Sequence, residues 1–310
     1  MKIIIDTDIG MDCDDAGALA VAHALADMNK CEIIAITSCT SRVSGIAAID
    51  VINRYYGRPE IPIGAYLPDG FLDENPKEYY SEFICRNFHH SYPDKKNCAD
   101  AIKVLRKALS EVRENELTIV SIGQLNNMAA LLKSKPDDLF SLSGLEIIKQ
   151  KNIKLVSMAG CFIDTDKYFA PNEPEWNVKM DVASAKFVVE NWPAGLIFCP
   201  FEMGAVIKTG QMLSDTPKNN PVRECYKQFA IIHSSHIRES WDQTAVHYAV
   251  TQDEELWSLS ENGRILMDNF GVTSFVTSEP QNRFFVSLKN AEAAFEQIEQ
   301  LMAKLPKNQP

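Results

Sequence analysis

The residues best suited to chemistry are five aspartates within ten positions near the start of the chain. Residues 6–15 read DTDIGMDCDD; they follow an apolar run at 2–5 and precede a small-residue stretch typical of a helix. Carboxylates at this density repel one another unless a positive charge lies among them. A hard cation such as Ca²⁺, which takes carboxylate and carbonyl oxygens as ligands, meets that need, and a helix N-terminus favours the ionised forms of Asp14 and Asp15.

Three alternative roles fit the spacing of this cluster less well. Helix capping by Asp14 or Asp15 would leave the remaining acids without a role. An EF-hand loop is excluded, because its glycine position holds Met11 and its twelfth position holds Gly17. Phosphatases of the haloacid dehalogenase type also place Asp-x-Asp after a first strand, but Gly10 stands where they carry Thr or Val.

The composition and net charge of the chain limit which kinds of molecule it is expected to bind. The chain has 310 residues, 45% of them hydrophobic, and a formal net charge of −11, which argues against nucleic acid or an anionic membrane as a partner. A neutral sugar, a nucleoside or a metal cation fits this charge better. The start of the chain reaches Asp6 without an apolar run long enough for a signal peptide, and the eight cysteines form no C-x-x-C pair, so we expect a cytoplasmic protein with reduced thiols.

The hydrophobic pattern predicts an α/β protein with a mostly parallel central sheet flanked by helices, a Rossmann-like core in a single domain over 1–310. Strands are expected at 2–5, 32–37, 61–64, 117–122, 153–158 and 196–199, and helices at 14–28, 44–56, 98–112, 125–133, 182–190, 243–250 and 291–304. Residues 271–277 and 283–288 read as a hairpin. The segment 68–93, rich in Tyr, Pro and charge, is expected to loop over one end of the sheet.

Five motifs together resemble the inosine-uridine preferring nucleoside hydrolase family. Residues 6–15 look like the longer variant of its signature D-x-D-x-G-x-D-D. Residues 119–127 are similar to its strand followed by T-G-P-L-T-N, and 157–160 to its M-G-G strand end. Residues 172–177 resemble N-x-x-x-E-x-N, and 241–245 resemble H-D-P-x-A. The likeness spans about residues 2 to 290, in family order, so it implies the fold of that family.

The resemblance implies calcium-dependent hydrolysis of the N-glycosidic bond of ribonucleosides, or related N-ribosides, to ribose and free base. It assigns Ca²⁺ to Asp8, Asp15, Asp242 and the backbone carbonyl of Ile122. Asp8 would also be the general base that takes a proton from the attacking water. Asp6 would be a supporting hydrogen-bond acceptor.

The resemblance also supplies substrate contacts. Asp14 and Asn177 would bind ribose hydroxyls, with Asn172 and Glu175 near the 5′-hydroxyl. The alternative interpretation of Asn172 and Asn177 is that they form turns, given Pro171, Pro174 and the acidic residues around them. Family members are commonly homodimers or homotetramers, and the resemblance implies the same here.

The largest departure from the family is Trp241, which stands where a histidine is proposed to protonate the leaving base. An indole N–H donates hydrogen bonds but delivers no proton at neutral pH. His233 and His236, three apart on an expected helix before Trp241, are one source of a proton. Alternatively, Trp176 and Trp241 stack on the base, or the substrate has a leaving group that needs little help.

Two other functions remain open from the residues alone. The loss of the family histidine suits a nucleoside or ribose binder that kept the metal site but lost catalysis. A phosphohydrolase with Asp6 or Asp8 as nucleophile would instead need magnesium and a phosphorylated substrate.

Overall fold

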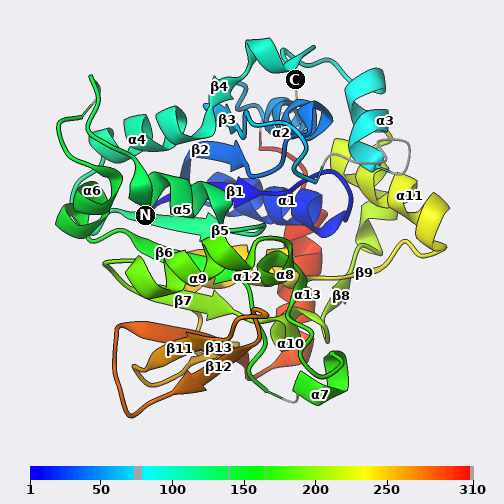
Figure 1. The fold of residues 1–310 in the computed structure, drawn as a ribbon. Helices are drawn as coiled ribbons and strands as arrows, with labels where there is room; N and C mark the ends of the chain where they lie inside the picture. The colour runs from blue at the N-terminus through cyan, green and yellow to red at the C-terminus, as the bar shows by residue number, and fades with distance from the viewer. Residues whose placement is uncertain (73–78, 139, 164, 308–310) are drawn as a thin grey trace.

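The central sheet of the computed structural model, which describes residues 1–72, 79–138, 140–163 and 165–307, has nine strands in the order β10-β13-β7-β6-β5-β1-β2-β3-β4 (Figure 1). Eight of them run parallel, and β10 pairs antiparallel with β13 at one edge. The strands are β1 (Lys2–Thr7), β2 (Glu32–Ser38), β3 (Ile63–Ala65), β4 (Ala99–Asp100), β5 (Leu117–Ser121), β6 (Lys154–Met158), β7 (Leu196–Cys199), β10 (Trp257–Leu259) and β13 (Arg283–Leu288).

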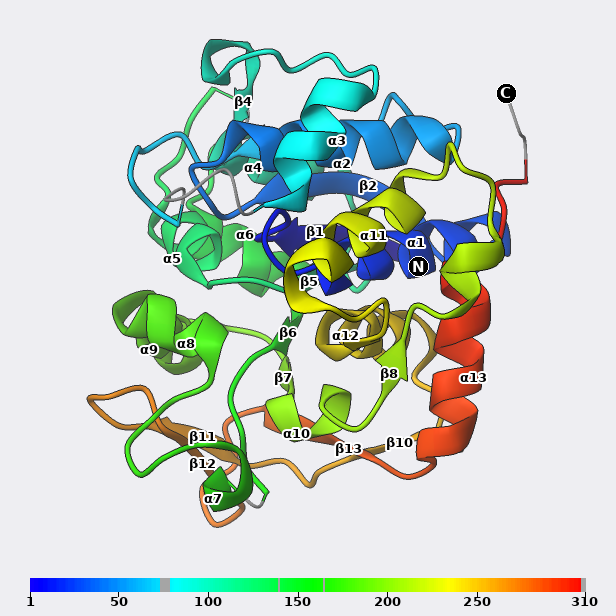
Figure 2. The same cartoon turned by 90° about the vertical axis from the view of Figure 1, so that its right-hand side faces the viewer.

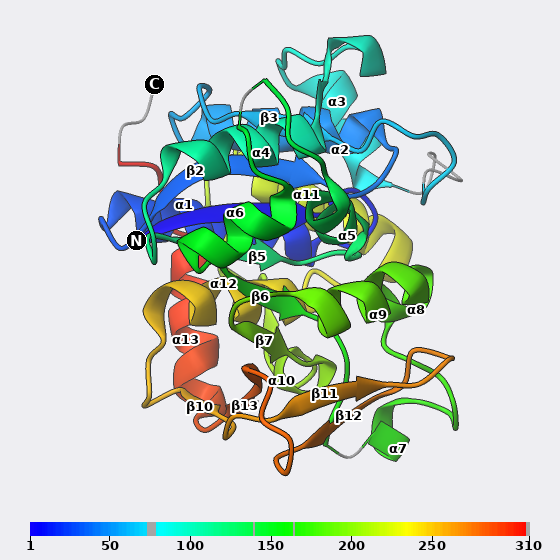
Figure 3. The same ribbon diagram turned by 60° about the vertical axis from the view of Figure 1, so that its left-hand side comes forward.

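Helices cover both faces of this sheet, as Figures 2 and 3 show from two sides. One face carries α1 (Asp14–Asp27), α2 (Val43–Tyr55), α12 (Trp241–Thr251) and α13 (Ala291–Met302), and the other carries α4 (Ala101–Glu111), α5 (Asn126–Lys133), α6 (Gly144–Lys151) and α9 (Val182–Asn191). Successive residues of a strand point to opposite faces, so Ile3 and Ile5 enter one core while Ile4 enters the other. The predicted α/β class is confirmed.

The remaining elements complete the fold. They are α3 (Tyr80–Asn87), α7 (Thr165–Tyr168), α8 (Trp176–Met180), α10 (Phe201–Gly204), α11 (Pro221–His233), β8 (Lys208–Thr209), β9 (Arg238–Glu239), β11 (Arg264–Met267), β12 (Thr273–Val276) and 3₁₀ turns at Lys95–Asn97 and Met212–Asp215. Among the described residues, no helix combines the length and the apolar character needed to cross a membrane.

The predicted hairpin near the C-terminus is wrong. β12 pairs antiparallel with β11, whereas β13 joins the main sheet parallel to β7. The buried guanidinium of Arg283 explains this, because it donates hydrogen bonds to the backbone carbonyls of Val189, Trp192 and Ala194 beside β7. A charged residue at the start of a strand thus fixes its place in the sheet through contacts that strand periodicity does not reveal.

The segment 68–93 is only partly a loop. It contains α3, in which Tyr80 and Ile84 are buried four residues apart, as on one face of a helix. Residues 73–78 of this predicted loop lie outside the described residues.

His23 is a fully buried histidine in α1. Its Nε2 lies 2.9 Å from the side-chain oxygen of Asn53, and its ring stacks on Tyr56 with centroids 4.7 Å apart. Burial, with the nearby positive charge of Arg58, lowers the pKa of His23 from 6.5 to about 3. The folded protein therefore keeps this ring neutral at pH values where the unfolded chain protonates it.

Acidification should accordingly destabilise the protein through His23. In the window below pH 6.5 and above the folded pKa, only the unfolded chain binds the proton, so stability falls as pH falls. From pH 7.5 to 5.5 this amounts to about 1.4 kcal/mol of unfolding free energy, and His23→Gln should lose that component. Urea unfolding at both pH values measures it, with exposed His89→Gln as control. Identical pH dependence in His23→Gln and wild type would contradict the expectation.

Candidate active site

The site lies where the strand order reverses. In the sheet, β1 lies between β2 and β5; the chain first adds strands on the β2 side of β1 and later adds strands on the β5 side. Open parallel sheets bind ligands at such a reversal of strand order. Asp8 follows β1 and Ile122 follows β5, and the Ile122 backbone N–H donates to the Asp6 carbonyl at 2.7 Å. A Cβ at Gly123 would lie 2.8 Å from the backbone nitrogen of Asp8, so glycine allows these two loops to approach.

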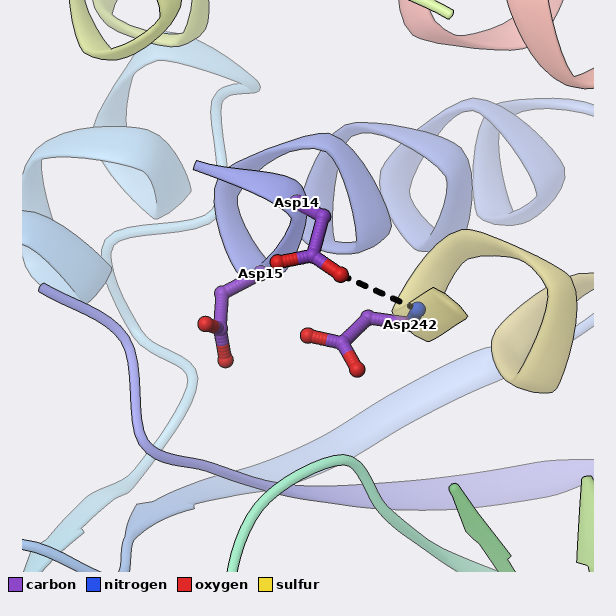
Figure 4. A group of neighbouring side chains, drawn as sticks. All are labelled: Asp14, Asp15 and Asp242. Atoms are coloured by element: carbon purple, nitrogen blue, oxygen red, sulfur yellow. Dashed lines mark hydrogen bonds between the residues drawn. The ribbon is translucent and has the colours of Figure 1, made fainter. Parts of the chain in front are cut away.

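Three aspartates gather beside these loops. Asp14 and Asp15 open α1, and Asp242 lies in the first turn of α12, the helix packed along α1. Their carboxylates point toward one another in Figure 4, with ligand oxygens all within 4.8 Å. The Asp242 backbone N–H donates to Asp14 at 3.4 Å, and the Thr7 hydroxyl donates to Asp15 in a short contact.

Protein groups offset little of the charge of this cluster, because Arg238, which lowers the pKa of Asp14, forms its ion pair with Asp12. Asp14, Asp15 and Asp242 are buried, and none forms an ion pair with a lysine, arginine or histidine in the part of the chain that the structure describes. Burial, and then the neighbouring carboxylates, raise the pKa of all three well above its usual value. A divalent cation is the countercharge that such a set of hard oxygen donors fits.

Asp8 lies in the same cavity and is held by a buried amide. Gln124 Nε2 donates to Asp8 Oδ2 at 2.8 Å and to Asn177 Oδ1 at 3.2 Å, while Asn177 Nδ2 donates to the Met158 carbonyl at 3.1 Å. Burial raises the pKa of Asp8 to about 6, although the bond from Gln124 lowers it. A carboxylate with this pKa suits proton removal near neutral pH.

Two further buried acids support these groups. Asp6 accepts hydrogen bonds from the Thr37 hydroxyl at 2.5 Å and from Asn127 Nδ2 at 2.8 Å. Glu175 caps α8 and accepts the backbone N–H of Asn177 at 2.8 Å, which fixes that asparagine. Burial raises the pKa of Asp6 and of Glu175 to about 7.

Aromatic side chains line the cavity with the carboxylates. The cavity holds about 310 Å³, and Trp176, Phe201 and Trp241 all border it. The rings of Phe201 and Trp241 lie 5.0 Å apart, and Trp176 is 45% exposed. The indole N–H of Trp241 donates to the Phe201 carbonyl at 3.1 Å, so it is already occupied. The cavity therefore combines oxygen ligands with flat apolar surfaces.

Comparison with known proteins identifies the family of the chain. The family model described as inosine-uridine preferring nucleoside hydrolase matches residues 3–294, nearly the whole chain. The chain belongs to this family. Nucleoside hydrolases cleave N-glycosidic bonds, so the resemblance read from the motifs is confirmed. No curated protein matches the chain in sequence.

Solved nucleoside hydrolases share the fold at low sequence identity. An inosine-uridine preferring nucleoside hydrolase from Bacillus anthracis is 18% identical with a TM-score of 0.71, covering 97% of this chain and 99% of its own. A purine-preferring ribonucleoside hydrolase from Gardnerella vaginalis is 17% identical with a TM-score of 0.71, covering 99% of each chain. A plant nucleoside hydrolase is 16% identical with a TM-score of 0.66, covering 97% and 98%.

Three residues expected at the nucleoside hydrolase site do not line the cavity. The expected helix face shared by His233 and His236 is wrong, because Ser234 adopts a left-handed backbone with φ of 58° and ends α11 at His233. His233 stacks on Phe229 with ring centroids 4.1 Å apart. Asn172 lies in an exposed turn with φ of 64°, which agrees with its alternative interpretation as a turn residue.

The sequence reasoning missed Phe201 and Arg238, which line the cavity, and Gln124, which holds the Asp8 carboxylate. Gln124 stands within 119–127 where the family motif has proline, and that departure was a usable signal. Phe201 comes two residues after β7, so the rule that ligands lie at the carboxyl ends of strands could have found it. Arg238 gives no sequence signal, because the pairing of β9 with β8 brings it to the cavity.

The aspartate cluster predicts that Ca²⁺ stabilises the protein. A ligand that binds only the folded state at 100 times its Kd adds about 2.7 kcal/mol, which raises the melting temperature. Asp242→Asn should lose most of that rise, because it removes a negative oxygen donor. The exposed Asp138→Asn should keep it. Thermal unfolding with Ca²⁺ or with chelator measures both, and an equal rise in Asp242→Asn and wild type would argue against binding at this cluster.

Proposed function

We propose that this chain is a calcium-dependent N-ribohydrolase that converts ribonucleosides, or closely related N-ribosides, to ribose and free base. The observation that carries the proposal is a single cavity bordered by Asp8, the three crowded aspartates and aromatic side chains. Carboxylate and amide oxygens match ribose hydroxyls, and aromatic rings match a planar base. Membership of the nucleoside hydrolase family supports the same reaction.

In this proposal Asp8, Asp15, Asp242 and the carbonyl of Ile122 hold the calcium ion. All four residues border the cavity, and Asp14, Asp15 and Asp242 bring their carboxylates together. Calcium accepts such mixed carboxylate and carbonyl donors. When bound, the ion neutralises the cluster and makes a nearby water a better nucleophile.

The residues of the chain supply the remaining steps. Asp8 takes the proton of the attacking water, with Gln124 keeping its carboxylate oriented at 2.8 Å. Asp14 and Asn177 bind ribose hydroxyls, and Glu175 holds Asn177 in place. Because glycosidic cleavage passes through an oxocarbenium-like state, negative charge near the ribose ring stabilises the transition state.

In this proposal Trp241 stacks on the base and does not protonate it. The Trp241 N–H is bonded to the carbonyl of Phe201, so the residue offers its ring to the substrate. Trp176, 45% exposed in the free protein, supplies a second aromatic surface. Stacking on both rings favours a planar base and gives the substrate a fixed orientation.

We further propose that the enzyme is cytoplasmic and acts in purine or pyrimidine salvage as a homodimer or homotetramer. The eight cysteines are all free thiols, which suits a reducing compartment. Release of free base from a nucleoside is the chemistry that salvage requires. The oligomeric state rests on family membership.

A substrate panel tests the function directly. Purine, pyrimidine and nicotinamide ribosides are incubated with the protein, with and without chelator, and released ribose is measured as reducing sugar. We expect ribose from at least one class and its loss with chelator. The replacement of the family histidine by Trp241 also suits a protein that only binds ribosides. Binding of a riboside without release of ribose, measured by calorimetry, would establish that alternative.

Substitution of the proposed base should separate turnover from binding. Asp8→Asn is expected to lower kcat by about 10²–10⁴-fold, because the amide cannot accept the proton of the attacking water. Riboside affinity should change far less, since the amide oxygen still coordinates. Asp138→Asn serves as the matched control. A kcat near the wild-type value in Asp8→Asn would mean that another residue is the base.

A further inference from the structure

Arg238 is the only cationic side chain among the described residues that border the cavity. It belongs to β9, and the pairing of β9 with β8 brings it to the first turn of α12. Its guanidinium carbon lies 4.7 Å from the ring centre of Trp241. Arg238 therefore lies beside the residue that replaces the family histidine.

Two carboxylates hold this guanidinium in place. Asp12 accepts hydrogen bonds from Nε at 2.9 and 3.0 Å and from Nη2 at 2.5 Å, and Glu239 accepts one from Nη1 at 2.9 Å. Arg238 has only 28% of its side chain exposed. A planar group held on two edges and resting over an aromatic ring loses little further freedom when a substrate binds.

The anchored guanidinium keeps hydrogen-bonding capacity. Of its five N–H groups, the bonds to Asp12 and Glu239 occupy three, which leaves one on Nη1 and one on Nη2 without a partner among the described residues. Burial alone would lower the pKa of Arg238, but the hydrogen bonds and charge of Asp12 raise it by more, so its pKa lies above the usual value. The group therefore stays cationic. It can stabilise negative charge but cannot transfer a proton.

The charge around Arg238 narrows the ligand class. Asp12 balances its positive charge, Glu239 is shared with Lys208 at 2.9 Å, and four more aspartates, Asp8, Asp14, Asp15 and Asp242, line the same cavity. An anionic substrate, such as one carrying a phosphate, is therefore disfavoured. A neutral base with oxygen or nitrogen acceptors, which gains negative charge only as it departs, fits this position.

We propose that Arg238 contacts the departing base and stabilises the negative charge that develops on it, and that Asp12 positions Arg238 for this role. The inference rests on the proposed N-ribohydrolase function. The bond from the anomeric carbon to the base nitrogen breaks, and its electron pair goes to the base. Water oxygen bonds to the anomeric carbon and gives its proton to Asp8. The base leaves as an anion paired with Arg238 and takes a proton from solvent water, and the hydroxide left behind takes the proton from Asp8, which restores its carboxylate.

Leaving-group dependence tests this role. Arg238→Met, Arg238→Lys and Asp12→Asn are compared with Arg113→Met, a control arginine that is 88% exposed and paired with Glu116. Each is assayed on inosine, uridine and 4-nitrophenyl riboside, whose leaving group needs no stabilisation. Calcium-dependent thermal stabilisation checks that each variant keeps its fold and its metal site.

We expect Arg238→Met to lower kcat on inosine and uridine by about 10²-fold, the usual cost of removing one charge-stabilising donor, and to change 4-nitrophenyl riboside hydrolysis by less than about 10-fold. Arg238→Lys should recover part of the loss, because it keeps the charge. Asp12→Asn should show the same substrate pattern at smaller size, with kcat affected more than KM. Equal losses on all three substrates, or no loss, would overturn the proposal.

Different results would contradict the proposed hydrolase function and the proposed role of Arg238. If wild-type protein releases no ribose from any riboside, the hydrolase function fails, and calorimetric binding of inosine then decides about Arg238. Weaker binding by about 10-fold or more in Arg238→Met, with unchanged binding in Arg113→Met, would support contact with the base. Equal affinity in both variants and wild type would overturn that contact.

Discussion

Three buried carboxylates share a space in which their oxygens lie within 4.8 Å of one another, and the arrangement of the site depends on that crowding. Asp14 and Asp242 are 228 residues apart in sequence, so the crowding exists only because α1 and α12 pack side by side. Both helices direct their N-terminal turns at the cluster, which gives it a partial positive charge. That charge is too small to balance three carboxylates, and the crowded oxygens are a set of donors that could hold a metal ion.

The cavity joins two parts of the fold with different constraints. One side contains Asp8 and Ile122, which parallel-strand geometry fixes at the carboxyl ends of β1 and β5. Its aromatic side comes from the short elements that carry Trp176, Phe201 and Trp241. Connecting elements vary more readily than strands. The same fold can therefore keep one ribose chemistry while its surface for the base changes.

The extension of the aspartate motif has a structural partner. Asp12 lies in the two residues added to the family signature, and it pairs with Arg238 across 226 residues. Arg238 in turn lies over Trp241, the residue that replaces the family histidine. The added segment of the longer signature and the residue that replaces the family histidine thus meet on one side of the cavity, while the other cavity aspartates keep the family order.

The sequence by itself determined the fold class and the position of most strands and helices. Strand 196–199 and the start of α1 at Asp14 were predicted to the residue, because buried parallel strands and their following helices leave strong local hydrophobic patterns. The aspartate motif indicated a cation because the repulsion between closely spaced carboxylates can be inferred from their sequence positions alone.

Tertiary structure alone decided the contacts between distant segments. Strand periodicity does not select a partner, so the parallel pairing of β13 with β7, beside which Arg283 donates its hydrogen bonds, is seen only in the tertiary structure. Helix periodicity did not reveal that Ser234 ends α11 before His236. Arg238 reaches the cavity through the pairing of two short strands and its bond to Asp12. Local sequence encodes burial and periodicity. Contacts between distant residues, such as that of the Arg238 guanidinium with the Trp241 ring, form only when the chain packs.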